Sequence, residues 1–289
     1  MKKEFNKFCE DIRLTPKQNE DAKIKYTGVC KTLHNEYYES DYDGKTKLLF
    51  GSYKTKTNTR PLSEMQDVDA LFKITQETFD KFDAYESNGQ SALLQEIKDI
   101  LKETYSTTDK VSAWGKVVLV KMAYNTHNVE VLPALEKGDG TFTIPNSADG
   151  GSWEDFDPRK QIDEFQTSNV NTNGLTAELD RMMKAWKRNT SSMTYSSYEL
   201  LSDIMSFLDI EFTKGAEFDD YYEVVKNFYT EFLPELEELV EKGAHSKDPA
   251  KVAASSSLRA KIDETLATKN HRWFIDKTDP EEKARRAKA

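Results

Sequence analysis

The stretch FGSYKTKTNTRPLSEMQDVDALFKI, residues 50–74, places a Gly-Ser pair ahead of an Asp-Val-Asp triplet that opens an apolar run. The composition of DVDALFKI favours a β-strand over residues 67–74. Because successive side chains of a strand point to opposite faces, Asp67 and Asp69 should project together from one face of a sheet. The sequence therefore predicts two carboxylates held close to each other.

Two carboxylates at this spacing repel each other, and the pKa of one rises unless a divalent cation lies between them. Mg²⁺, or Mn²⁺ in its place, is the ion that such oxygen ligands favour. The same spacing recurs in DYD at residues 41–43 and in DFD at residues 155–157, both in polar, turn-like surroundings. Only Asp67 and Asp69 lie in a strand that follows another strand and a Gly-Ser turn, so they are the candidate metal ligands.

The Gly-Ser pair and a third acid extend this candidate site. Gly51 and Ser52 at a strand end would leave backbone N–H groups and a hydroxyl free to hold phosphate oxygens. Glu130 lies in HNVEVLPAL, a second apolar strand pattern over residues 127–135, where an isolated carboxylate has no reason to be buried. Three acids on adjacent strands could hold two Mg²⁺ ions, which is an arrangement suited to nucleotidyl transfer.

The first half of the chain is predicted to form a mixed sheet with flanking helices. Thr15-Pro16 opens a helical pattern, and a second helix is expected across residues 92–105. A further strand is expected over residues 115–122, and Asp139-Gly140 predicts a hairpin turn between two β-prone runs. The fold class is therefore α+β, with a nucleotidyltransferase core expected over residues 1–165.

The second half is predicted to be a helical lobe. Residues 145–173 are rich in Asn, Ser, Gly and Asp, which predicts a long, partly irregular crossing segment. Beyond Gly174 the apolar spacing is helical throughout, with Pro234 expected to kink or divide its helix and a last charged helix expected from Pro280. The lobe is expected to span residues 166–289.

Composition limits the partners. The 289-residue chain carries a formal net charge of −10 and has no basic tract, which argues against a long nucleic acid as partner. A small phosphorylated ligand remains compatible with this charge. The longest apolar run, at residues 117–120, is far too short to span a membrane, and the N-terminus has no signal-peptide core. We expect a cytoplasmic protein without membrane contact.

The motifs together resemble a known family. GSYKTKTN, DVD and VEVLPAL, in this order, are similar to the nucleotidyltransferase fold of the DNA polymerase β superfamily. More narrowly, the chain resembles the CD-NTases, the bacterial relatives of metazoan cyclic GMP-AMP synthase and of oligoadenylate synthase. IPNSADGGSWEDFDPRK, LDRMMKAWKRN and SSYELL resemble further landmarks of that family, so that the resemblance runs from about residue 50 to residue 201.

The resemblance implies roles for individual residues. Asp67 and Asp69 would ligate the metals, with Glu130 as the third acid. The nucleotide-binding positions would be Gly51, Ser52, Lys184, Ser197 and Tyr198. Within this set, Ser52 would touch the donor phosphates, Lys184 and Ser197 would hold the triphosphate, and Tyr198 would stack on the donor base.

Some of these residues have a plainer interpretation. Arg181, Lys184 and Arg188 share one side of a predicted helix, and such a stripe is usually a solvated face. Tyr198 and Trp186 are residue types that more often pack in a core than bind a base. The family usually has Asp where this chain has Glu130, so this residue could ligate a metal, serve mainly as the base, or mark a weakened enzyme.

The implied activity is the joining of nucleoside triphosphates into a cyclic di- or trinucleotide, with release of pyrophosphate. In the resembling family the product is a second messenger that activates an antiphage effector, and regulators encoded nearby are further expected partners. Two alternatives stay open: a nucleotidyltransferase that modifies RNA, a protein or a small acceptor, and a non-catalytic nucleotide-binding module.

Overall fold

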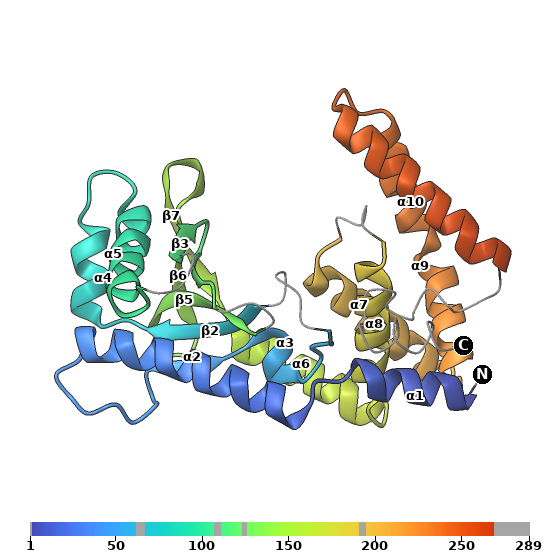
Figure 1. Cartoon of the computed structure of the whole chain (residues 1–289), viewed down its shortest axis with the longest axis horizontal. Coiled ribbons are helices and arrows are strands. Elements are labelled where there is room, and N and C mark those ends of the chain that lie inside the picture. The colour runs from blue at the N-terminus through green and yellow to red at the C-terminus, as the bar shows by residue number, and fades with distance from the viewer. Residues whose placement is uncertain (1, 62–66, 107–110, 123–125, 191–194, 269–289) are drawn as a thin grey trace. The chain divides into compact units, whose positions relative to one another are not determined.

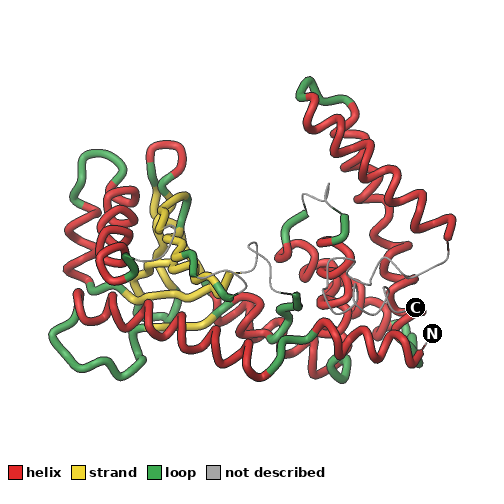
Figure 2. Tube along the Cα trace, in the orientation of Figure 1, coloured by secondary structure: helices red, strands yellow, loops and turns green. Residues whose placement is uncertain are grey.

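The computed structural model describes residues 2–61, 67–106, 111–122, 126–190 and 195–268 (Figure 1). The chain forms two compact units. One comprises residues 14–58 and 62–164 and is called the sheet unit below; the other comprises residues 1–13, 59–61 and 165–289 and is called the helical unit. Among the described residues, every strand belongs to the sheet unit (Figure 2).

The sheet unit is built on a seven-stranded mixed sheet. Its main path runs β1-β2-β5-β4-β3, with β6 paired to β5 and β7 paired to β6. β2 and β5 are parallel neighbours, whereas the other pairs are antiparallel. The strands are β1 (Lys47–Leu49), β2 (Asp67–Lys73), β3 (Val111–Trp114), β4 (Val117–Val120), β5 (Asn128–Glu136), β6 (Phe142–Asn146) and β7 (Ser152–Phe156).

Two long helices cover one face of this sheet. α2 begins after Thr15, as the Thr-Pro pair predicts, and the Thr15 side chain and Gln18 form a capping box. α2 and α5 pack with alternate residues of β2, β4 and β5 in one buried apolar core. The helices of the unit up to this point are α2 (Pro16–Tyr37), α3 (Gly51–Thr55), α4 (Gln76–Asp83) and α5 (Gly89–Thr104).

The expectation of an irregular segment over residues 145–173 is wrong. This part of the chain completes β6, forms a short 3₁₀ turn (η1, Ala148–Gly150), returns as β7 and then forms α6 (Pro158–Asn171). β6 and β7 pair in antiparallel register from Phe142 opposite Phe156 to Asn146 opposite Ser152. β7 has no buried residue, whereas Phe142, Ile144 and Pro145 of β6 are buried, so the β7 half of the hairpin has only a weak periodicity in the sequence.

The helical unit contains α1 (Lys2–Ile12), α7 (Leu175–Arg188), α8 (Ser197–Thr213), α9 (Tyr221–Ala244) and α10 (Pro249–Thr268). The helical pattern predicted beyond Gly174 is thus confirmed over the described residues. Pro234 lies inside α9, which continues as one helix, so the proline does not divide it. The charged helix expected from Pro280 lies outside the described residues.

The N-terminal helix belongs to the helical unit. Phe5, Cys9 and Ile12 are buried in the same apolar core as α7, α8 and α9. From the sequence we expected this segment in the nucleotidyltransferase core, whereas the structure divides the chain between Arg13 and Leu14 and again between Glu164 and Phe165. Over the part of the chain that is described, no helix has the length and apolar character needed to cross a membrane.

Candidate active site

The predicted carboxylates lie on two neighbouring parallel strands. Asp69 of β2 is in register with Glu130 of β5, and Asp67 is in register with Asn128. The apolar residues that alternate with the acids, Val68 and Ala70 on β2 and Val129 and Val131 on β5, are fully buried. Alternation therefore places the three acids on the sheet face opposite the core formed with α2 and α5.

Burial and mutual repulsion set the charge of these acids. Burial raises the pKa of Asp67, although a hydrogen bond from Asn128 and the positive charge of Lys121 act in the opposite direction. The Asp67 Oδ1 atom is buried and has no hydrogen-bond partner among the described residues. Burial, followed by the negative charges of Asp67 and Asp69, raises the pKa of Glu130 to about 7. The site thus gathers acidic groups whose negative charges act on one another.

Gly51 is required where the chain passes from β1 into α3. Its φ of +62° lies in the left-handed region, which favours glycine. A Cβ atom at this position would also lie 2.3 Å from Asp69 Oδ2. Next to it, the Ser52 hydroxyl accepts a hydrogen bond from Asn58 Nδ2 at 2.8 Å. Gly51 is therefore packed directly against one of the candidate metal ligands.

Within the described residues, no three His, Cys, Asp or Glu side chains are gathered closely enough to make a metal site by themselves. The acids nevertheless fit a hard divalent cation, because Asp67 offers an unpartnered oxygen and the local charge is negative. Mg²⁺ is commonly held by one or two carboxylates together with substrate phosphates and water, so a complete protein cage is not needed.

In the helical unit, the sequence-predicted residues lie on α7 and at the start of α8. The Lys184 ammonium forms an ion pair with Asp180 at 2.6 Å, and Asp180 is fully buried. Ser197 is the first residue of α8, and Lys187 Nζ donates a hydrogen bond to its hydroxyl at 3.5 Å. Tyr198 is 60% exposed, so it is not a core residue.

The interpretation of the α7 stripe as a solvated face is wrong. Arg181 is only 6% exposed and forms an ion pair with Glu178 at 2.9 Å. Arg188 donates hydrogen bonds to the Pro61 carbonyl and to Thr59. These cations hold the helical unit together instead of facing solvent. Trp186 is fully buried in the helical core, as its residue type suggests.

A comparison with protein families decides the relationship. Residues 1–169, more than half of the chain, match the model of the Second Messenger Oligonucleotide or Dinucleotide Synthetase (SMODS) domain. The chain belongs to the SMODS family. The function expected from the sequence, a nucleotidyltransferase that makes a cyclic oligonucleotide second messenger, is thereby confirmed, as is the resemblance to the CD-NTases of CBASS signalling. SMODS enzymes of this group generally use divalent metal ions.

Solved structures share the fold of this SMODS chain. CdnC of E. coli MS115-1 in complex with HORMA-deltaN has a TM-score of 0.63 at 17% identity, covering 95% of this chain and 94% of that one. The CdnE cyclic dinucleotide synthase of Elizabethkingia meningoseptica with GTP and Apcpp has a TM-score of 0.61 at 15% identity, covering 92% and 99%.

The Vibrio cholerae DncV cyclic AMP-GMP synthase with nonhydrolyzable GTP has a TM-score of 0.58 at 15% identity and covers 92% of the SMODS chain and 90% of its own. No curated protein sequence matches. These likenesses confirm the α+β fold with a mixed sheet and a helical part.

Two polar residues that contact predicted site residues were not named by the sequence analysis. Lys187 contacts Ser197, and Lys184 is paired with Asp180 at the i, i+4 spacing, which was a readable signal of an ion pair. Burial lowers the pKa of Lys187, and the nearby charge of Lys184 acts in the same direction. Asn128, whose side chain contacts Asp67, carries no recognisable sequence signal.

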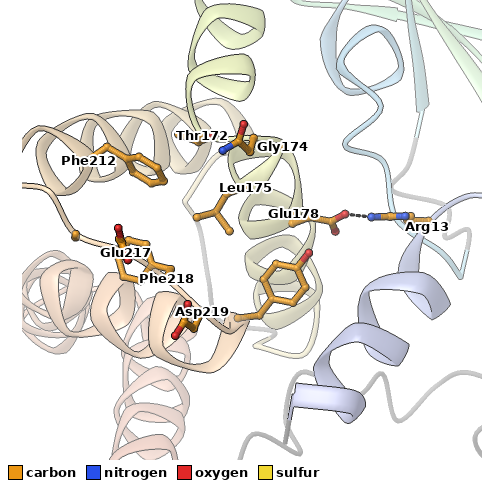
Figure 3. Close-up of a pocket in the computed structure, with 12 residues that line it drawn as sticks. Arg13, Thr172, Gly174, Leu175, Glu178, Phe212, Glu217, Phe218 and Asp219 are labelled. Carbon is orange, nitrogen blue, oxygen red and sulfur yellow. Dashed lines mark ion pairs between the residues drawn. The ribbon is translucent and has the colours of Figure 1, made fainter.

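The SMODS chain also has a cavity of about 700 Å³ within the helical unit, lined by none of the predicted site residues (Figure 3). Leu175, Phe212 and Phe218 supply apolar walls, and the Glu178 carboxylate is turned toward the Arg13 guanidinium, with which it forms an ion pair. Glu178 therefore already has its counter-charge, and the cavity has no chemistry that links it to nucleotidyl transfer.

Proposed function

We propose that this SMODS enzyme joins nucleoside triphosphates in a Mg²⁺-dependent reaction centred on Asp67, Asp69 and Glu130. The supporting observation is the register that sets Asp69 beside Glu130 on parallel strands, with Gly51 packed against Asp69. A ribose hydroxyl of one nucleotide attacks the α-phosphate of another, and pyrophosphate leaves. Repetition of this step and a final ring closure, each with loss of pyrophosphate, give a cyclic di- or trinucleotide.

In this proposal the sheet unit supplies the carboxylates that bind the metal ion and accept the proton. Asp67 and Asp69 hold Mg²⁺ through their carboxylate oxygens, and the bound ion would neutralise triphosphate charge and lower the pKa of the attacking hydroxyl. Glu130 would act as the general base that accepts the proton of that hydroxyl. Its alternative role is that of a third metal ligand.

The helical unit supplies groups for the donor nucleotide. Ser197 and the ammonium groups of Lys184 and Lys187 contribute phosphate contacts, and the exposed ring of Tyr198 stacks on a base. Nucleoside triphosphates are the expected substrates, since E. coli CdnC is known with ATP and V. cholerae DncV with nonhydrolyzable GTP. Ser52 completes the set by touching the donor phosphates.

Two protein partners follow from the same proposal. The cyclic product would activate a downstream antiphage effector. A regulatory protein is also expected, since E. coli CdnC is found in a complex with HORMA-deltaN.

The decisive experiment incubates the purified chain with labelled ATP, GTP, CTP and UTP and either Mg²⁺ or Mn²⁺, followed by phosphatase treatment and mass spectrometry. The variant Asp67→Ala/Asp69→Ala is expected to form no phosphatase-resistant product. Asp41→Ala/Asp43→Ala is the matched control, because it removes the same spacing of acids from an exposed turn. This control should retain the wild-type product.

The nature of the product separates this proposal from its alternatives. A phosphatase-resistant cyclic nucleotide that depends on Asp67 and Asp69 supports it and names the bases. Linear or acceptor-linked nucleotides would instead favour a transferase for RNA, protein or a small molecule. If the product still forms in the double variant, Asp67 and Asp69 are not catalytic residues.

A further inference from the structure

Asn128 connects three strands beside the candidate active site. It is the first residue of β5, is 6% exposed, and stands in register with Asp67 of β2. Its Oδ1 atom accepts a hydrogen bond from the backbone N–H of Met122, which follows β4, at 3.0 Å. Its side chain is also hydrogen-bonded to the Asp67 carboxylate. A single amide thus spans the ends of β4, β5 and β2.

The residue before it anchors Asn128 to α2. His127 is fully buried, its Nδ1 lies 2.7 Å from Asp21 Oδ2, and its backbone N–H donates to the same oxygen at 3.4 Å. Lys25 forms an ion pair with Asp21 at 3.0 Å. The His127 ring also meets the Tyr53 ring edge to face at a centroid distance of 5.1 Å. The backbone at the start of β5 is therefore held from α2 and from α3.

These contacts leave the Asp67 carboxylate in a defined state. The Asp67 carboxylate is hydrogen-bonded to the Asn128 side chain. Its Oδ1 atom has no hydrogen-bond partner among the described residues. An amide suits this place because it offers an acceptor to Met122 and a donor to Asp67 at once. Aspartate could supply only the acceptor, and an aliphatic residue could supply neither.

We infer that Asn128 is a positioning residue that fixes the Asp67 carboxylate with Oδ1 directed to a divalent cation. The inference rests on the proposed function of Asp67 as a metal ligand. Groups that hydrogen-bond to metal ligands fix their orientation, and their loss typically costs about 10- to 100-fold in metal affinity or activity. The Asn128 amide is expected to act in this way without touching the nucleotide.

The test measures Mn²⁺ binding to the full chain in the presence of a nonhydrolysable ATP analogue, from the loss of the free-Mn²⁺ electron paramagnetic resonance signal beyond the loss that the analogue alone causes. Asn128→Ala is expected to raise the half-saturating Mn²⁺ concentration about tenfold or more. Steady-state pyrophosphate release should show a reduced kcat with the nucleotide KM changed by less than about threefold. Thermal unfolding and circular dichroism verify the fold of each variant.

Asn146→Ala is the matched control. Asn146 also uses both ends of its amide, donating to Glu154 at 2.7 Å and accepting from the Ala148 N–H at 3.0 Å, but it lies on β6. The Asn146→Ala variant should bind Mn²⁺ with the half-saturating concentration of the wild type. Should Asn128→Ala fail to fold, Asn128→Asp keeps the acceptor for Met122 and replaces the donor to Asp67 by a second carboxylate that repels it, and its kcat is expected to fall about tenfold or more.

The outcomes separate this inference from the proposed function. If the wild-type chain binds no Mn²⁺ with the analogue, the metal role of Asp67 and this inference both fail. If the wild type binds Mn²⁺ and the folded Asn128 variants retain its half-saturating concentration and kcat, only the positioning role of Asn128 is overturned.

Discussion

Gly51 and Asp69 leave no room between them for one additional carbon, because a Cβ atom on Gly51 would lie 2.3 Å from Asp69 Oδ2. The contact joins the turn between β1 and α3 to Asp69, one of the three acids of the candidate active site. The glycine therefore serves the carboxylate as well as the turn, and a substitution at Gly51 should displace a candidate metal ligand.

Gly51→Ala is expected to lower product formation about 100-fold or more, since a displacement of about 1 Å at a reacting centre can cost that much. Gly115→Ala is the control: Gly115 also has a positive φ, of +57°, yet a Cβ atom added there would meet nothing within 4 Å. Both variants should lose about 1 kcal/mol of stability from backbone strain. Equal activity of the two variants would contradict the role assigned to the contact.

Glu130 should make the stability of the metal-free protein depend on pH. Burial and the two aspartates raise its folded-state pKa from 4.5 to about 7, so the folded chain binds more protons than the unfolded chain between these values. The free energy of unfolding should therefore fall as pH rises from about 4.5 to 7. After allowance for solvent screening at this half-buried side chain, we expect about 1–2 kcal/mol.

Chemical unfolding of wild type and Glu130→Gln at pH 5 and pH 8, with a chelator present, measures this effect. The glutamine variant should remove the contribution of Glu130 to the pH dependence and should be the more stable chain at pH 8. Identical pH slopes for the two proteins would show that Glu130 keeps an ordinary pKa.

Lys184 and Lys187 should differ in what their loss affects. Lys184→Ala leaves the fully buried Asp180 without this ion pair, and breaking a buried pair typically costs about 3–5 kcal/mol. Lys187→Ala should cost less than about 1 kcal/mol of stability and should raise the nucleotide KM about tenfold, a change worth about 1.4 kcal/mol of binding. Melting temperature and nucleotide KM should be measured on both variants. A Lys187→Ala variant with a changed melting temperature and an unchanged KM would contradict the role of Lys187 in nucleotide binding.

Tyr198→Ala should weaken nucleotide binding while leaving the fold intact. Its side chain is 60% exposed, and stacking of a base on an aromatic ring is worth about 1–3 kcal/mol. The KM of the donor nucleotide should rise about tenfold, with the melting temperature nearly unchanged. Tyr198→Phe keeps the ring and should behave as wild type; a defect in this variant would assign the effect to the hydroxyl.

The acidic strands were predictable because their pattern is local. Alternation over residues 67–74 and 127–135 gives the strands and the face that the acids share. Their parallel pairing brings Asp69 and Glu130 into register, in agreement with the expectation of acids on adjacent strands. The start of α2 after Thr15 was similarly readable from the Thr-Pro pair.

The features that the sequence did not predict depend on tertiary contacts. β7 has no fully buried residue, so no clear alternation marks it; its Trp153 packs on Phe79 of α4 at a ring-centroid distance of 4.7 Å. The contact of Asn128 with Asp67 exists only once β2 and β5 are paired. The buried state of Arg181 likewise depends on the packing of α1 and α7, which composition does not predict.

The helical unit is formed from separate segments of the chain, and this limits how the two units can be expressed separately. Residues 1–13 belong to the helical unit, and the chain re-enters that unit at residues 59–61 and finally at residue 165. The sheet unit is in effect an insertion into the helical unit. A cut after residue 165 would split α6 and deprive the helical core of Phe5, Cys9 and Ile12. Separate expression should therefore fuse residues 1–13 to the C-terminal part through a linker, not truncate at one point.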